Sequence, residues 1–153
     1  MSVTYRIDRS RRLVCSIAAG VVTLEQFMDH QKRLRSDAEF DPSFGQLADF
    51  LPTAELKLTN HEVERVASDK LFAETSRRAI VAGSAVIFGL CRMFEAYRET
   101  SGAGERVKVF YDRDLALKWL FSRSNQPITQ SKRELHSDAL RQRPEGVAFY
   151  SVS

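Results

Sequence analysis

Cysteine is scarce in this sequence, and long apolar runs are absent. The 153 residues include two cysteines, Cys15 and Cys91, without a Cys-x-x-Cys spacing, which excludes a disulfide scaffold. No apolar stretch approaches the ~20 residues of a membrane-spanning helix, so we expect no membrane span. The start of the chain lacks an apolar segment behind basic residues, so we expect no secretory signal and a cytoplasmic protein. Both cysteines are then expected to be buried small hydrophobic residues.

Neither sign of charge is in strong excess. Lysine and arginine number 23, against 20 aspartates and glutamates, which gives a net charge of +3. Nucleic-acid-binding domains gather their basic residues on one face or helix. Here the basic residues are scattered, apart from Arg9, Arg11 and Arg12 at a predicted turn. We therefore expect no nucleic-acid partner.

The common catalytic and cofactor motifs are missing. The sequence has no Gly-x-Ser-x-Gly elbow, no phosphate-binding Gly-x-x-x-x-Gly-Lys loop and no Gly-x-Gly-x-x-Gly after a strand. His61-Glu62 begins like the zinc motif His-Glu-x-x-His, but Arg65 stands where the second histidine is needed. His30 and His136 have no ligand-type neighbour one helical turn away, so both are expected at the surface. We expect no enzyme, no cofactor and no metal site.

Hydrophobic periodicity predicts a series of short strands. The first two alternate polar and apolar residues and form a hairpin, and the later ones are short apolar or alternating runs. The predicted strands span residues 3–8, 13–19, 44–51, 79–82 and 106–111.

Helices are predicted between and after these strands, each beginning at a capping residue. The caps are Thr23, Thr59, Ser84 and Asp112, and the first two belong to capping-box patterns. The order is therefore β-β-α-β-α-β-α-β-α. This order predicts an α/β fold with a mixed, mostly parallel sheet and helices packed on it.

The composition changes near residue 123. Residues 1–122 form one predicted domain, and residues 123–153 are mostly polar and include Pro127 and Pro144. We expect this C-terminal extension to be partly flexible, or packed on the surface or on a neighbour.

Asp49 stands at the carboxyl end of a predicted central strand, where open α/β sheets place their ligands. The alternative is a charge that marks the exit of the strand to solvent. An enzyme with an unrecognised site is a further hypothesis, in which Asp49 works with His61 or Arg92.

The predicted helix at 84–100 carries apolar residues on more than one face. A core stripe needs only about three apolar residues in two turns, and Phe88, Met93 and Tyr97 exceed it. The surplus indicates a second contact: a protein partner, a second subunit or a small apolar ligand. The C-terminal extension could cover the same residues instead.

Several short segments share their order and spacing with a known superfamily. They are Tyr5-x-Ile7-Asp8, Gly20-x-Val22-Thr23, Phe40-Asp41-Pro42, Leu47-x-Asp49, Arg78-Ala79-Ile80-Val81, Phe88-Gly89-Leu90-x-Arg92-Met93-Phe94-Glu95, and Val109-Phe110-x-Asp112 with Ala116-x-x-Trp119-Leu120. Over residues 3–122 the chain resembles the small bacterial proteins of the SpoIIAA-like superfamily, often grouped as STAS/SEC14-like domains.

The resemblance implies a non-enzymatic regulatory or protein-interaction domain. Anti-sigma-factor antagonists of the wider family are switched by phosphorylation of a serine or threonine after a strand that ends in Asp. Here Asp49 is present without the Asp-Ser-Ser-Gly motif, and Thr53 and Thr59 are the nearest hydroxyls. The SEC14 side of the resemblance implies the alternative, a small-molecule or lipid carrier.

We therefore expect a protein partner or a homo-oligomer, with a small apolar ligand as the alternative occupant. The residues expected to form this surface are Asp49, Thr53, Phe88, Arg92, Met93 and Tyr97, and the candidate phosphorylation sites are Thr53 and Thr59.

Overall fold

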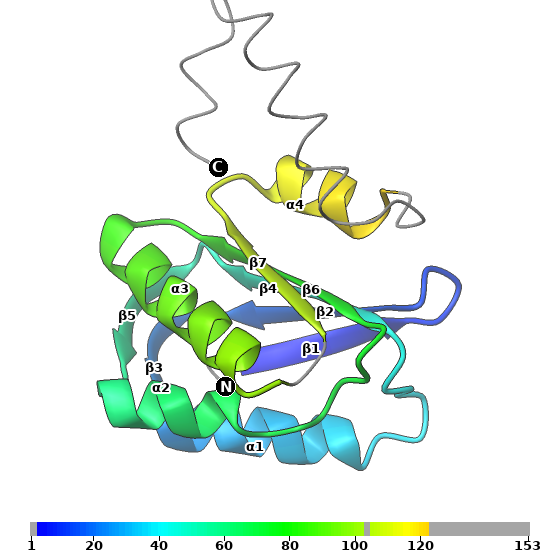
Figure 1. Cartoon of the computed structure of the whole chain (residues 1–153), viewed down its shortest axis with the longest axis horizontal. Coiled ribbons are helices and arrows are strands. Elements are labelled where there is room, and N and C mark those ends of the chain that lie inside the picture. Colours follow the sequence, from blue (N-terminus) through cyan, green and yellow to red (C-terminus); the bar gives the residue numbers. More distant parts are fainter. Residues whose placement is uncertain (1–2, 103–104, 123–153) are drawn as a thin grey trace, which may run out of the picture. The chain divides into compact units, whose positions relative to one another are not determined.

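The computed structural model describes residues 3–102 and 105–122. A five-stranded sheet has the order β1-β2-β4-β6-β7 (Figure 1). Strand β1 is antiparallel to β2, and every other neighbouring pair in this sheet is parallel. The strands are β1 (Val3–Asp8), β2 (Leu13–Ala18), β4 (Gly45–Phe50), β6 (Arg77–Ala82) and β7 (Arg106–Phe110). The expected mostly parallel α/β sheet is confirmed. The predicted extension at 123–153, which includes His136, lies outside the described residues.

Helices cover both faces of this sheet. They are α1 (Leu24–Arg35), α2 (Asn60–Ala67), α3 (Ala85–Thr100) and α4 (Arg113–Leu120). One core cluster joins Ala48 and Ile80 of the sheet to Ile87 of α3, with Phe27 of α1 packed against it. Another joins Leu47 to Ala116 of α4. The helices α1, α2 and α3 thus share one face, and α4 lies on the other (Figure 1).

The predicted capping residues begin the helices. Thr23 and Thr59 each form a capping box, with Gln26 and Glu62 respectively at the third helical position. The side chain of Ser84 accepts a hydrogen bond from the backbone N–H of Ile87. Asp112 precedes α4, and its carboxylate accepts from the N–H of Asp114 at 2.7 Å. These contacts satisfy N–H groups that a helix start leaves without partners.

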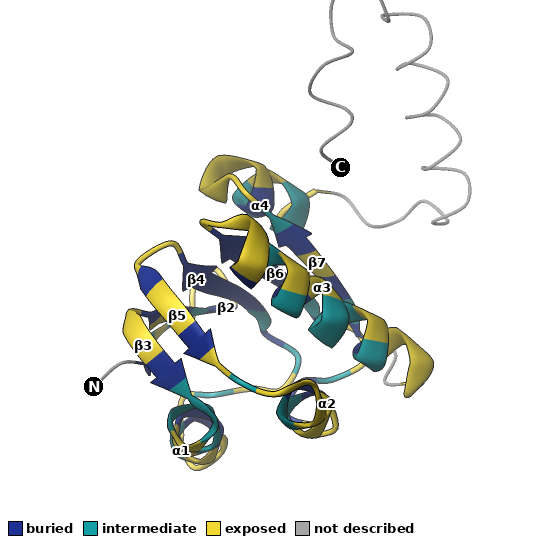
Figure 2. Ribbon diagram, turned by 90° about the vertical axis from the view of Figure 1, so that its left-hand side faces the viewer, coloured by how far each residue is buried: buried dark blue, intermediate teal, exposed yellow. Residues whose placement is uncertain are grey.

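Two short strands that the sequence analysis did not predict form a second sheet. Strand β3 (Gly20–Thr23) runs parallel to β5 (Thr53–Lys57). The predicted strand ends at residue 19, and Gly20, with a positive φ of 69°, turns the chain directly into β3. Val22 and Leu56 are buried in the same core cluster, while the outer face of the pair is exposed (Figure 2). Strands of four and five residues carry too few alternations to be recognised, and their pairing joins distant segments.

The register of the main sheet brings two polar residues together. Strand β6 starts at Arg77, two residues before the predicted start at residue 79, so Arg77 and Arg78 belong to the strand. Gln46 of β4 is the direct partner of Arg78 on β6. Both side chains are buried. Because side chains alternate along a strand, both lie on the face that Ala48 and Ile80 share with α1, α2 and α3.

Candidate functional site

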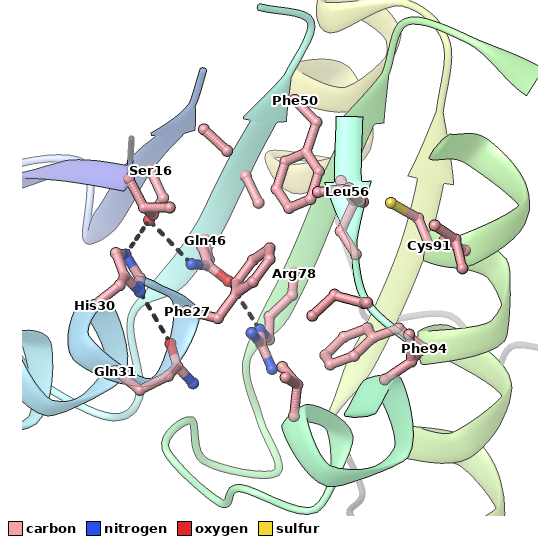
Figure 3. A pocket seen from close by; sticks show the side chains of 18 residues that line it. Ser16, Phe27, His30, Gln31, Gln46, Phe50, Leu56, Arg78, Cys91 and Phe94 are labelled. Atoms are coloured by element: carbon pink, nitrogen blue, oxygen red, sulfur yellow. Dashed lines mark hydrogen bonds between the residues drawn. The ribbon is translucent and has the colours of Figure 1, made fainter. Parts of the chain in front are cut away.

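A cavity of about 80 Å³ lies between the sheet and helices α1, α2 and α3 (Figure 3). Most of its wall is apolar, and one part is polar. The apolar wall includes Phe27, Ala48, Phe50, Leu56, Cys91 and Phe94. The polar part consists of Ser16, His30, Gln31, Gln46 and Arg78. The cavity therefore combines a surface for an apolar group with a set of fixed hydrogen-bonding groups.

The polar wall contains a chain of hydrogen bonds that starts at Arg78. Arg78 Nε donates to Gln46 Oε1 at 2.9 Å, and Gln46 Nε2 donates to Ser16 Oγ at 3.1 Å. Ser16 Oγ lies 2.9 Å from His30 Nε2 (Figure 3). Three neighbouring strands and one helix thus each contribute one member.

The chain continues through α1. His30 Nδ1 lies 3.0 Å from Gln31 Oε1, and Gln31 Nε2 donates to Asp69 Oδ2 at 3.4 Å. An amide oxygen can only accept, so Nδ1 carries the proton of the His30 ring, and Nε2 accepts from the Ser16 hydroxyl. Every donor then points from the Arg78 guanidinium toward the Asp69 carboxylate. Hydrogen bonds aligned in this way polarise and strengthen one another.

This chain requires a neutral His30. The residue is 3% exposed, and burial lowers the pKa of its imidazole from 6.5 to about 4, against the hydrogen bond with Gln31, which raises it. The prediction of a surface His30 is wrong. Position 30 lies three residues after Phe27 and four before Leu34, so it belongs to the buried stripe of α1.

The guanidinium of Arg78 lies within cation–π distance of two aromatic rings. Its central carbon is 4.5 Å from the ring centroid of Phe72 and 5.3 Å from that of Phe94. Arg78 Nη1 donates to Glu105 Oε1 at 3.1 Å, and Arg98 Nη2 reaches the same oxygen at 2.5 Å. Burial lowers the pKa of Arg78, and the neighbouring Glu105 carboxylate opposes that shift.

Arg98 closes the hydrogen-bonded chain into a ring. Its Nη1 donates to the backbone oxygen of Asp69 at 3.1 Å, while the Asp69 side chain forms an ion pair with Arg35. We call the set Ser16, His30, Gln31, Gln46, Asp69, Arg78, Arg98 and Glu105 the polar ring. Two buried guanidinium groups in it share one carboxylate. Among the described residues, Arg98 Nε and Glu105 Oε2 are buried without a hydrogen-bond partner.

The ring does not have the parts of a serine hydrolase. Ser16 and His30 are within the reach of a nucleophile and its base. However, the group that orients His30 is the neutral amide of Gln31, not a carboxylate. Ser16 also lies within β2, which pairs with β1 and β4 on its two sides, so the strand offers no free row of N–H groups for an oxyanion. Burial raises the pKa of the Cys91 thiol to about 12, which keeps it protonated.

The structure places Asp49 away from the cavity. Its buried carboxylate accepts from the backbone N–H of Leu51 at 2.9 Å and from Arg113 Nη1 at 3.0 Å. His61 is exposed and lies 3.9 Å from Glu64. Arg92 is also exposed and lies 3.6 Å from Glu95 on its own helix. Each of Asp49, His61 and Arg92 thus has a different partner, and the structure does not assemble them into one site.

The apolar surplus on α3 is partly used inside the domain. Phe88 stacks on Tyr111 with a centroid distance of 4.0 Å, and it packs against the core. Met93 and Tyr97 are half-buried, whereas Val86 at the start of the helix is 75% exposed. The exposed apolar surface of α3 therefore lies at its first turn.

The two candidate phosphorylation sites differ in access. Thr53 is buried in β5, and its hydroxyl donates to the backbone oxygen of Ala18 at 2.8 Å. Thr59 is exposed, and its hydroxyl accepts from the N–H of Glu62 at 3.1 Å. In this conformation only Thr59 is accessible to a kinase.

The members of the polar ring were not predicted from the sequence as site residues. Gln46 interrupts an apolar strand, and His30 and Gln31 interrupt the apolar stripe of a helix. A polar residue at a position that periodicity marks as buried is the signal that identifies them. Within residues 3–102 and 105–122, no group of His, Cys, Asp or Glu is arranged to hold a metal ion. None of the helices described there is long and apolar enough to cross a membrane.

Comparison with known proteins gives a structural neighbour. The chain is similar to an uncharacterized protein of the DUF3478 family from Shewanella loihica PV-4, whose crystal structure has a SpoIIAA-like fold. The TM-score is 0.52 at 22% sequence identity, and the similarity covers 78% of this chain and 93% of that chain. No family model and no curated protein matches the sequence. At this identity the likeness concerns the fold, and the chain has a SpoIIAA-like fold.

Proposed function

We propose that this protein is a non-enzymatic binding domain for a small molecule with an apolar body and a polar end. The observation that supports the proposal is the cavity, whose apolar wall meets the polar ring at Ser16, His30, Gln46 and Arg78. Small-molecule sites have this character, with mostly apolar walls and a few fixed polar groups.

The size of the cavity limits the ligand. An apolar cavity of ~150 Å³ holds a benzene molecule, so about 80 Å³ accommodates roughly three or four heavy atoms. Each methylene group buried there contributes about 0.8 kcal/mol. The ligand is therefore a small molecule, or the end of a longer one whose remainder lies outside this cavity.

Native mass spectrometry of the untagged protein, purified gently from its own cells, tests the proposal. We expect additional mass that is released on denaturation. Ala48→Val fills part of the cavity wall and should remove that mass, because Ala48 lines the cavity. The matched control is Ala54→Val on the exposed side of β5, which should retain it. A wild-type protein of bare mass, with no small molecule that raises its melting temperature, would refute the proposal.

A second candidate function is that of a regulatory or protein-interaction domain. It is favoured by exposed apolar side chains at the carboxyl ends of the parallel strands, where Leu51 is 45%, Val86 75% and Leu115 53% exposed. We expect Val86→Asp to abolish self-association or capture of a partner, measured by sedimentation and by pull-down. Met93→Asp, at a half-buried position on the same helix, tests the surface proposed from the sequence. If neither change alters assembly, α3 is not the interaction surface.

A further inference from the structure

The charges within the polar ring cancel. Arg78 and Arg98 each contribute one positive charge. Glu105 and Asp69 each contribute one negative charge, and the Glu105 carboxylate pairs with both guanidinium groups. His30 is neutral, because burial lowers the pKa of its imidazole to about 4. An ionic ligand would therefore bring an uncompensated charge into buried surroundings, where such a charge is costly.

The polar groups of the cavity wall bond mainly to one another, and two neighbouring atoms keep spare capacity. Ser16 Oγ accepts from Gln46 Nε2 and donates its own proton to His30 Nε2, which leaves it one lone pair. Gln46 Nε2 has two protons, and within the described residues only Ser16 accepts one of them. The two atoms are 3.1 Å apart, and both residues are 4% exposed and line the cavity. A ligand group that both donates and accepts can bond to both atoms.

The apolar wall and the size of the cavity determine the rest of the ligand. Phe27, Phe50, Leu56 and Phe94 form a surface that an alkyl group can contact. The volume of about 80 Å³ accommodates roughly three or four heavy atoms. The part of the ligand inside the cavity is therefore a short alkyl chain with one small polar group.

We infer that the cavity binds a small aliphatic alcohol, whose hydroxyl donates to Ser16 Oγ and accepts from Gln46 Nε2. This inference rests on the proposed binding function and names its ligand class. A hydroxyl both donates and accepts, whereas a carbonyl oxygen can only accept and an ammonium group can only donate. A hydroxyl is also uncharged, as the cancelled charges of the ring require. The alkyl chain of the alcohol lies against the apolar wall.

Four probes of similar size test the inference on the wild-type protein. They are 1-propanol, 1-propanethiol, propylammonium and acetate, which all match the roughly three or four heavy atoms of the cavity. Binding is followed through the methyl resonances of Ala48 and Leu56, which line the cavity, at constant ionic strength and under reducing conditions. We expect 1-propanol to bind at least about tenfold more tightly than either ion, because the ring compensates neither charge.

The thiol distinguishes a hydroxyl site from a cavity that binds any apolar molecule. 1-Propanethiol is more apolar than 1-propanol, and burial of a hydroxyl without a hydrogen bond is costly. In a merely apolar cavity the thiol would therefore bind more tightly. We expect 1-propanol to bind the wild-type protein at least as tightly as the thiol, because Ser16 and Gln46 bond to its hydroxyl.

Ser16→Cys separates the hydrogen bond from the shape of the cavity. The thiol of the variant takes the place of the hydroxyl and is a weak acceptor. We expect this variant to bind 1-propanol about fivefold less tightly relative to 1-propanethiol, the factor that one neutral hydrogen bond gives. Ser68→Cys, at an exposed position that follows α2, is the matched control and should keep the wild-type ratio. If Ser16→Cys does not fold, the four probes on the wild-type protein still decide.

The outcomes separate the inference from the proposed function. Tighter binding of 1-propanethiol than of 1-propanol to the wild-type protein would overturn the alcohol inference and leave a cavity that binds apolar molecules. Binding of propylammonium or acetate as tight as that of 1-propanol would also overturn it. If no probe binds while the native protein carries a mass that Ala48→Val removes, the ligand is of another class and the inference is wrong. If no probe binds and the native protein carries no such mass, both fail.

Discussion

On the face of the sheet covered by α4, strands β4 and β6 present Leu47, Ala79 and Val81, each 0% exposed, against Ala116. On the opposite face the same strands present Gln46 and Arg78, and a cavity remains. One face is a close-packed apolar core, and the other combines a cavity with buried charge. Because side chains alternate along a strand, a short segment such as Gly45–Phe50 supplies both. The comparison indicates that the α4 face stabilises the sheet and that the three-helix face carries the cavity.

The largest effect is expected when the polar ring loses the charge of Glu105, the buried carboxylate that pairs with both Arg78 and Arg98. Glu105→Gln leaves Arg78 and Arg98 without a compensating charge, and breaking a buried ion pair in this way costs about 3–5 kcal/mol. We expect this loss in the free energy of unfolding, measured by urea denaturation. Glu64→Gln, at an exposed position of α2, is the control and should stay within about 0.5 kcal/mol. A cost below about 1 kcal/mol would show that water compensates the arginines and that the ring is not a dry cluster.

A comparable but slightly smaller effect is expected on the other face. Leu47→Ala creates a void against α4 and should lower the free energy of unfolding by about 2–5 kcal/mol. Because Leu47 points away from the cavity, the bound mass seen by native mass spectrometry should remain. Loss of that mass in a variant that is still folded would show that the two faces are coupled, and the division between core and site would be wrong.

The contrast between the faces also marks what the sequence could predict. The order of the helices and of the five strands of the main sheet, the parallel strands and the caps at Thr23, Thr59 and Ser84 follow from local patterns and were predicted, whereas β3 and β5 were not. The polar ring joins residues from position 16 to position 105, each of which alone is typical of a surface side chain. Only the register that pairs Gln46 with Arg78 brings them together. Three members could have been found earlier, since Gln46 interrupts an apolar strand and His30 and Gln31 lie on the apolar stripe of a helix.

Acid should destabilise the three-helix face selectively. The pKa of His30 is about 4 in the folded protein and 6.5 when unfolded, so between these values the unfolded chain binds more protons. Stability is therefore full above pH 6.5 and is lost as the pH falls toward 4, by about 2 kcal/mol between pH 7 and pH 5. Urea denaturation at pH 7 and at pH 5 measures this loss of unfolding free energy. In His30→Gln the loss between the two pH values should be smaller by about 2 kcal/mol. In His61→Gln, an exposed position, the loss should persist. An unchanged pH dependence in His30→Gln would mean that His30 is not buried in a neutral form.

The smallest effect is expected at Asp49, which the sequence analysis placed at the site and the structure places opposite it. Asp49→Asn keeps an oxygen for the N–H of Leu51 and loses the ion pair with Arg113. Arg113 is 44% exposed, so the pair is screened by solvent and the change should cost less than about 1 kcal/mol. We also expect the bound mass to be unchanged, because the carboxylate does not line the cavity. Loss of ligand in a stable Asp49→Asn protein would return the site to the carboxyl ends of the strands, where α/β sheets commonly place their ligands. The polar ring would then be a structural network alone.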